Sequence, residues 1–172
     1  MEMFDLFDNN RLPLGKQIAR GTKVGVAGEN RQVVHICIFN SEGKFLIQRR
    51  DINKDVWPGY WDISAGGSAK AGETTAQAAS RELAEELGIK YDFSKIRPSF
   101  TINFINGFDD FYFIKKDFKM DEFNFTDGEV KEVRWASCED ILEMIDNKKF
   151  IPFYKSFIMF LFEAQGSYGC IR

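Results

Sequence analysis

Residues 67–89 read GSAKAGETTAQAASRELAEELGI, and this stretch decides the fold class. From residue 74 to residue 87 it is rich in Ala, Glu and Leu, which favour helix, and Gly88 follows as a suitable C-terminal cap. At 100° per residue, Ala76, Ala79, Leu83 and Leu87 share one face of that helix. An apolar face of this kind predicts a helix that packs on a sheet.

The neighbouring face of the predicted helix carries Glu82, Glu85 and Glu86. Like charges at spacings of three and four destabilise a helix by roughly 0.2–0.5 kcal/mol per pair. The helix dipole also disfavours acids in the last turn, by about 0.3–1 kcal/mol. A divalent cation would remove both penalties, because carboxylate oxygens are ligands that Mg²⁺ and Mn²⁺ prefer. Taken alone, the three acids are equally compatible with a solvated acidic face.

The residues before the helix add to the pattern. Gly66 and Gly67 lead into a loop at residues 68–72, and glycines let a backbone approach a ligand closely. Glu73 stands at the helix start, where the dipole favours an acid, and it is within reach of Arg81. Loop, acid, helix, arginine and acid cluster therefore form one unit.

This unit resembles the Nudix box: Gly, five residues, Glu, seven residues, Arg-Glu, an aliphatic, any residue, Glu-Glu, any residue, Gly and an aliphatic. All nine fixed positions are matched, by Gly67, Glu73, Arg81, Glu82, Leu83, Glu85, Glu86, Gly88 and Ile89. The resemblance implies a Nudix-type α/β/α sandwich with a mixed β-sheet. It also implies a Mg²⁺- or Mn²⁺-dependent hydrolase that cleaves a diphosphate linkage, in a nucleoside diphosphate derivative or a related small phosphorylated metabolite.

The resemblance assigns roles within the box. It implies that Glu82, Glu85 and Glu86 bind the metal, with the Gly67 carbonyl as a further ligand. Either Glu82 or Glu86 would also activate the attacking water, without a covalent intermediate.

The remaining roles lie around that centre. Arg81 would orient the glutamates through a salt bridge with Glu73. Many members use one more acid on a later strand or loop, and Glu129, in DGEVKEVRW, matches that position best. The alternative for Glu129 is an ordinary surface glutamate at a strand.

A basic segment precedes the box. Arg49, Arg50 and Lys54 lie at a predicted strand end and loop, where clustered bases suit diphosphate oxygens, although a solvated basic turn is the alternative. Residues 47–67 resemble the isopentenyl-diphosphate isomerase branch of the superfamily. In that branch, the residues that match Arg50 and Lys54 hold the substrate diphosphate.

The chain departs from the isomerases where their chemistry lies. Ala65 stands at their catalytic cysteine, and Gly67 and Arg31 stand at two of their metal-binding histidines. The strand that should supply a paired acid reads FTINFING and has none. We therefore expect hydrolysis. The alternatives are an isomerase of allylic diphosphates and a non-catalytic module that senses a nucleotide.

Length and charge limit the other classes of function. The 172 residues suit one domain, with residues 1–30 as an extension packed on it. A net charge of −3 gives no electrostatic footprint for nucleic acid or an anionic membrane. We expect a small-molecule diphosphate as the partner. A homodimer is compatible with the sequence, which does not fix the oligomeric state.

Cysteine usage indicates a reducing compartment. Cys37, Cys138 and Cys170 are an odd count without short spacing, which argues against a disulfide scaffold or a zinc ribbon. The N-terminus lacks a signal-peptide pattern, and the apolar stretch at residues 157–162 is too short to span a bilayer. These features predict a cytoplasmic protein.

The rest of the chain predicts strands interleaved with helices, and so a mixed sheet. His35 lies within an apolar strand and is interpreted as a core or pocket residue. Residues 1–30 read as short extended pieces around turns, and residues 51–60 as a loop. The predicted strands are residues 33–39, 44–49, 61–65, 99–105, 110–115 and 129–135, and the predicted helices are residues 74–87, 138–146 and 153–164.

Overall fold

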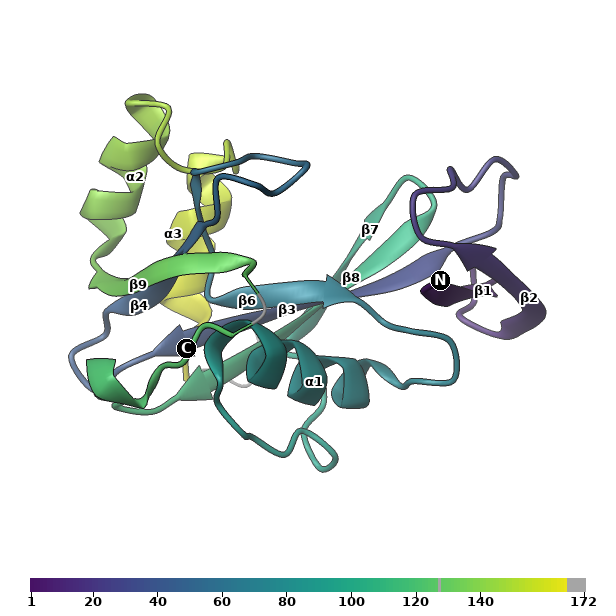
Figure 1. Cartoon of the computed structure of the whole chain (residues 1–172), viewed down its shortest axis with the longest axis horizontal. Helices are drawn as coiled ribbons and strands as arrows, with labels where there is room; N and C mark the ends of the chain where they lie inside the picture. Colours follow the sequence, from purple (N-terminus) through teal and green to yellow (C-terminus); the bar gives the residue numbers. More distant parts are fainter. Residues whose placement is uncertain (127, 167–172) are drawn as a thin grey trace.

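A computed structural model of the chain describes residues 1–126 and 128–166, and it contains one large mixed sheet and one small hairpin (Figure 1). The strand order of the large sheet is β5-β4-β3-β8-β7, with β6 also paired to β3 and β9 to β4. The elements are β1 (Met3–Phe7), β2 (Pro13–Ala19), β3 (Arg31–Phe39), β4 (Phe45–Arg50), β5 (Trp61–Asp62), β6 (Ala65–Ser68), α1 (Thr75–Leu87), β7 (Phe100–Phe104), β8 (Gly107–Lys115), a 3₁₀ turn (Met120–Glu122), β9 (Val130–Ala136), α2 (Cys138–Asp146) and α3 (Lys155–Ala164).

The central strand β3 is buried on both faces. It runs parallel to β8 and antiparallel to β4 and β6. Because side chains alternate along a strand, Val34 and Ile36 join the core under α1, whereas Cys37 and Phe39 join a second core under α2 and α3. Figure 1 shows α1 on one side of the sheet and α2 and α3 on the other. The predicted α/β/α sandwich with a mixed sheet is confirmed.

The strand predicted at residues 61–65 is wrong in its bounds, because this segment forms two short strands with different partners. β3 and β4 pair only at Phe39 and Phe45 and then separate. Into this gap the chain inserts β5, which pairs with β4, and then β6, which pairs with β3. At the switch, the Ser64 hydroxyl accepts from Ile38 N (3.0 Å) and donates to Leu46 O (2.6 Å). The insertion carries Gly66 and Gly67 to the start of the box.

The N-terminal residues form a hairpin, β1–β2, that is tied to the sheet. At its turn, Arg11 makes a bidentate ion pair with Asp110 of β8, at 2.9 and 2.6 Å. The Asp110 carboxylate is buried and also accepts from the Thr101 hydroxyl at 2.6 Å. Further along, Phe7 and Asn30 exchange two backbone hydrogen bonds of 2.8 Å. The hairpin is therefore held against the end of β3.

The same hairpin contacts the box loop. Ala71 N donates to Met3 O, and Gly72 N donates to the Asp5 carboxylate at 2.7 Å. These contacts join residues far apart in the sequence, and they bring β1 beside the segment that leads into α1.

Most other predicted elements agree with the structure to within one or two residues at each end. His35 is half-buried, with its ring stacked on Phe111 and its Nε2 3.1 Å from Asp109 Oδ1. Cys37 and Cys138 are free thiols, and Cys170 lies outside the described residues.

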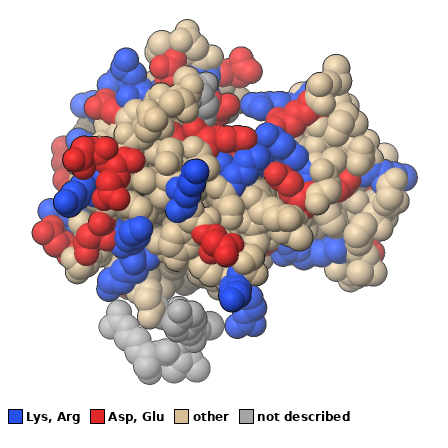
Figure 2. All heavy atoms as spheres, turned by 60° about the horizontal axis from the view of Figure 1, so that its bottom comes forward, with Lys and Arg blue, Asp and Glu red and all other residues tan. Residues whose placement is uncertain are grey.

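Two observations on the described residues concern membrane and nucleic-acid binding. Among the described residues, no helix has the length and apolar character needed to cross a bilayer. On the face shown in Figure 2, the acidic and basic side chains of the described residues are interspersed rather than gathered into one basic band. This distribution accords with the small net charge of −3.

Candidate active site

Local signals fix both ends of α1. Thr74 caps the helix, because its hydroxyl accepts from Gln77 N and the Gln77 side chain accepts from Thr74 N. Gly88 ends the helix in the left-handed region (φ 72°), where a Cβ would meet Asn124 O at 2.8 Å. A helix with both ends fixed holds its last two turns, which carry the acids, in one orientation relative to the sheet.

Glu86 is a buried carboxylate on the side of α1 that faces the sheet. Its residue is only 4% exposed, and its Oε2 accepts from Gln48 Nε2 (3.0 Å) and Gly66 N (3.1 Å). Burial raises the pKa of Glu86 to about 8, and the charge of Glu82 adds to the rise, while the two hydrogen bonds oppose it. The negative charge of Glu86 is therefore poorly compensated by the residues around it.

Glu82 lies directly against Gly67. A Cβ on Gly67 would stand 2.2 Å from Glu82 Oε1, so only glycine leaves room for this carboxylate. The Glu82 side chain is 12% exposed, and burial raises its pKa although the adjacent Arg81 lowers it. Two partly or fully buried acids thus converge beside the Gly66–Gly67 backbone.

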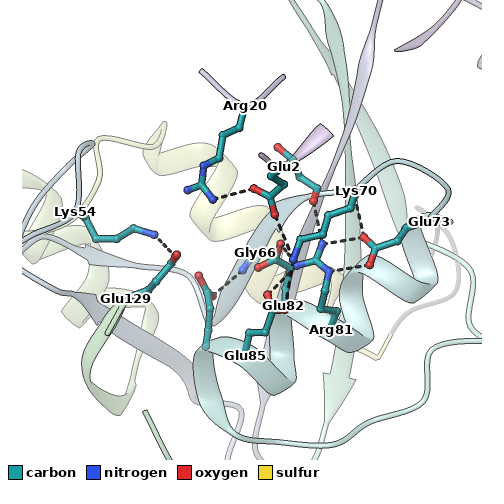
Figure 3. A network of polar contacts seen from close by, with 12 residues as sticks. Glu2, Arg20, Lys54, Gly66, Lys70, Glu73, Arg81, Glu82, Glu85 and Glu129 are labelled. Carbon is teal, nitrogen blue, oxygen red and sulfur yellow. Dashed lines mark hydrogen bonds and ion pairs between the residues drawn. The ribbon is translucent and has the colours of Figure 1, made fainter. Parts of the chain in front are cut away.

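Arg81 links the acids of the box (Figure 3). Its guanidinium makes a bidentate pair with Glu73, at 2.8 and 2.9 Å, and also donates to Ser68 O. Its Nη1 reaches Glu82 at 2.7 Å and Glu85 at 2.9 Å. Burial lowers the pKa of Arg81, but these ion pairs outweigh it and hold the pKa above its ordinary value. The salt bridge with Glu73 that the resemblance implied is present in the structure.

Two of the box acids, Glu82 and Glu85, line a cleft of about 340 Å³, whereas Glu73 and the buried Glu86 are not among its lining residues. On one side of it, Lys54 forms an ion pair with Glu129, which directly precedes β9 (Figure 3). Beside them, Arg50 donates to Asp62 Oδ2 (3.2 Å) and to Val56 O (3.0 Å). The cleft is lined by Glu2, Phe4, Arg20, Arg31, Arg50, Lys54, Gly66, Gly67, Ser68, Arg81, Glu82, Glu85 and Glu129.

Arg49 is the one predicted basic residue that does not line this cleft. Consecutive side chains on a strand point to opposite faces, so Arg49 and Arg50 diverge. Arg49 instead donates to Glu132 (3.1 Å) and to Gly59 O (3.2 Å), and about half of its side chain is exposed. The structure therefore brings Arg50 and Lys54 to the box, but not Arg49.

Comparison with known proteins assigns the family. The family model described as NUDIX domain matches residues 29–158. The chain belongs to the Nudix family. A curated relative, an uncharacterized Nudix hydrolase of Listeria monocytogenes, is 44% identical over 154 residues, which cover 90% of each chain. Nudix hydrolases generally cleave pyrophosphate bonds and depend on a divalent metal such as Mg²⁺ or Mn²⁺.

Two further comparisons concern a part of this Nudix hydrolase and its fold. An isopentenyl-diphosphate Δ-isomerase of Klebsiella pneumoniae is 42% identical over 64 residues, or 37% of this chain and 35% of its own length. The likeness to the isomerase branch is therefore real but partial. The crystal structure of DR0079 from Deinococcus radiodurans shares the fold, with a TM-score of 0.74, 23% identity, and coverage of 92% of this chain and 98% of that one.

The sequence did not point to every residue of the Nudix cleft. Gln48, which contacts Glu86, left a weak signal as the polar residue in an otherwise apolar run, FLIQ. Glu2, Phe4 and Arg20 left none, because the hairpin reaches the box only through long-range packing. The sequence marks Arg31 only as a departure from the isomerases, and it has no local sign that Arg31 lines the cleft.

The residues present fit a divalent ion if Glu82 and Glu85 exchange their contacts with Arg81 for contacts with the ion. Within the described residues, no three acidic, histidine or cysteine side chains already stand together as a ligand group. Arg81 holds both Glu82 and Glu85 in ion pairs. The donors are nevertheless hard oxygens, as Mg²⁺ and Mn²⁺ require, and the buried Glu86 has a charge in need of compensation. The Glu82 carboxylate among these donors lies against Gly67, which has no Cβ to displace it.

Proposed function

We propose that this Nudix hydrolase cleaves a diphosphate linkage in a nucleoside diphosphate derivative or a related small phosphorylated metabolite, with Mg²⁺ or Mn²⁺ as its cofactor. One observation carries the proposal. Glu82 lines the cleft and acts on the buried Glu86, whose negative charge is poorly compensated, and the basic residues Arg50 and Lys54 line the same cleft. Acids that suit a metal and bases that suit phosphate are the two requirements of diphosphate hydrolysis.

The proposed ligands of the metal are Glu82, Glu85, Glu86 and the Gly67 carbonyl, with Glu129 as an additional acid. A divalent ion bound there would supply positive charge to the diphosphate oxygens and make water more acidic. To bind it, Glu82 and Glu85 would exchange Arg81 for the ion, while Arg81 keeps its bidentate contact with Glu73.

A carboxylate base completes the proposed chemistry. Glu86 has a pKa of about 8 in the metal-free protein, so it accepts a proton near neutral pH more readily than an exposed glutamate does. Glu82, whose pKa burial also raises, is equally placed beside Gly67. Either residue can take the proton from the attacking water, and the role of base is open between them.

Arg50 and Lys54 are proposed to hold the diphosphate. Both cations line the cleft, where Lys54 is paired with Glu129 and Arg50 with Asp62. A phosphate oxygen is an alternative partner for each, and a guanidinium binds it in a bidentate manner. The substrate diphosphate would thus be held opposite the acids that bind the metal and activate the attacking water.

Hydrolysis is favoured over isomerisation by the cysteine positions. Ala65, at the place of the isomerases' catalytic cysteine, is buried and carries no acidic proton. Of the two described cysteines, Cys37 is buried in the core under α2 and α3, and neither lines the cleft. A non-catalytic sensor is disfavoured because all the box acids are retained.

The test is a panel of nucleoside diphosphate derivatives and isoprenoid diphosphates, incubated with Mg²⁺ or Mn²⁺ and scored for phosphate and monophosphate. We expect metal-dependent release from at least one compound, and a loss of turnover by orders of magnitude in Glu82→Gln and Glu86→Gln. Glu143→Gln, an exposed acid of α2 on the opposite side of the sheet, is the matched control. Tight nucleotide binding without turnover across the panel would favour the sensor instead.

A further inference from the structure

One cation in the cleft, Arg31, has no acidic partner among the residues that the structure describes. Of the basic residues that line it, Arg20 pairs with Glu2, Arg50 with Asp62 and Lys54 with Glu129. Arg81 is taken up by Glu73, Glu82 and Glu85. Arg31 alone among them forms no ion pair with any described residue.

The surroundings of Arg31 explain how it is held without such a partner. It is the first residue of β3 and is half-buried, and its backbone N donates to Asn106 O at 3.1 Å. Its guanidinium carbon lies 6.0 Å from the centroid of the Phe104 ring, a cation–π distance that favours the charge weakly. A half-buried guanidinium has five donors in a rigid fork, and the ring satisfies none of them as a hydrogen-bond acceptor. The fork is therefore available to a ligand in the cleft.

Arg31 belongs to the hairpin side of the cleft. It directly follows Asn30, whose backbone is paired with Phe7 of β1, and Phe4 of the same strand lines the cleft nearby. Figure 3 shows Arg20 and Glu2 in this region, apart from Lys54 and Glu129. Arg31 therefore enters the cleft from the start of β3, beside the hairpin, whereas Arg50 and Lys54 come from the end of β4 and the loop after it.

The hairpin side is tied to the sheet and already holds an anion. The Arg11–Asp110 ion pair, in which the Asp110 carboxylate is buried, joins the hairpin to β8. The Glu2 carboxylate accepts from Arg20 at 2.9 Å and lies 3.2 Å from the ammonium of Lys70, so an anion occupies this side of the cleft in the free protein.

We propose that Arg31 is a specificity-determining residue that binds an anionic group of the substrate, a phosphate or a carboxylate, other than the diphosphate that is cleaved. The proposal rests on the proposed function, since it names the class of diphosphate that this cleft prefers. Substrates of that class have a second charged group, which lies against Arg31 while Arg50 and Lys54 hold the diphosphate. Bidentate donation from a guanidinium suits both phosphate and carboxylate.

Matched substrate pairs test this proposal. NADPH differs from NADH by one ribose phosphate, and UDP-glucuronate differs from UDP-glucose by a carboxylate in place of an alcohol. We expect the wild type to show a higher kcat/KM for the more charged member of at least one pair, and the responding pair identifies phosphate or carboxylate. Arg31→Gln should lower kcat/KM for that member by about 10- to 150-fold, the effect of one charge-assisted contact. The less charged member should be hydrolysed as before.

Two further variants keep the test interpretable. Arg31→Lys, which keeps the charge but not the fork, should retain part of the preference and shows that the protein folds with this position changed. Arg97→Gln removes an exposed arginine outside this cleft and should leave both members unaffected. An equal loss for both members in Arg31→Gln, or no preference in the wild type, would overturn the proposal.

Failure of the proposed function gives a different result. If the wild type hydrolyses none of the four compounds with Mg²⁺, hydrolysis of these diphosphates fails, and calorimetric binding of the same compounds decides the role of Arg31. Tighter binding of the more charged member that disappears in Arg31→Gln supports the anion subsite. Equal binding of paired members, or no binding at all, overturns it.

Discussion

Replacing Glu86 with Gln should stabilise the metal-free protein at alkaline pH while it abolishes activity. The substitution keeps the size of the side chain, and an amide oxygen can still accept from Gly66 N and Gln48 Nε2. What it removes is a negative charge that burial disfavours. If Glu86 belongs to a metal site of buried acids, its charge should destabilise the metal-free fold and still be required for activity.

The pH dependence of the effect follows from the raised pKa. Glu86 has a pKa of about 8 in the folded protein and returns to about 4.5 in the unfolded chain, so the folded state binds more protons between these values. The free energy of unfolding therefore falls as pH rises from about 4.5 to about 8, and the full cost is present above pH 8. At about 1.36 kcal/mol per pH unit, the upper limit is about 5 kcal/mol, and relaxation around the site should reduce it to the order of 1–3 kcal/mol.

Urea denaturation in the presence of a chelator measures this difference directly. The free energies of unfolding of the wild type and Glu86→Gln should coincide near pH 4.5 and diverge up to pH 8.5, with the variant the more stable. Glu143→Gln, an exposed acid, should follow the wild type throughout. A variant less stable than the wild type at pH 8.5, or a difference that does not change with pH, would show that Glu86 supports the fold and would refute this reasoning.

Three other perturbations test separate parts of the site. Millimolar Mg²⁺ or Mn²⁺ should raise the melting temperature of the wild type by mass action, and the shift should vanish in the double variant Glu85→Gln/Glu86→Gln; no shift in the wild type, with or without a phosphorylated ligand, would argue against the site. Arg50→Ala or Lys54→Ala should lower kcat/KM by about 10- to 150-fold. The loss should appear in KM if the residue binds the diphosphate equally in the ground and transition states, and in kcat if it binds the transition state more tightly. Unchanged kinetics in both variants would show that this loop does not bind the substrate. Gly67→Ala should displace the Glu82 carboxylate, because the new Cβ would stand 2.2 Å from its oxygen, and full activity in that variant would show that this contact is unimportant.

The box and its helix could be predicted from the sequence because their signals are local. Thr74, Gln77 and Gly88 define the ends of α1 through contacts within a few residues, and the spacing of the acids places them on one face. The salt bridge between Arg81 and Glu73 is also local, since it spans eight residues. The residues of one loop–helix unit can therefore be predicted from the sequence without knowledge of the rest of the fold.

The position of the β1–β2 hairpin beside the cleft could not be predicted, because it depends on contacts between residues far apart in the sequence. Arg11 meets Asp110 only after β8 has taken its place beside β3, and the sequence near Arg11 has no sign of that partner. The division of residues 61–68 into β5 and β6 has the same origin. It arises because β3 and β4 separate and Ser64 forms hydrogen bonds with both strands. No local sequence pattern indicates this separation. Arg49 was included for its proximity in sequence, which strand alternation overrides.

Incubation in ¹⁸O-labelled water tests whether this cleft performs metal-dependent hydrolysis of a diphosphate. A diphosphate from the panel is incubated with the protein and Mg²⁺, and the phosphate-containing products are analysed by mass spectrometry. Hydrolysis at this site predicts one ¹⁸O per cleavage in a phosphate product, with no incorporation when Mg²⁺ is chelated or Glu86 is replaced by Gln. Unlabelled phosphate products, conversion of isopentenyl diphosphate to its allylic isomer, or undiminished incorporation in Glu86→Gln would contradict it.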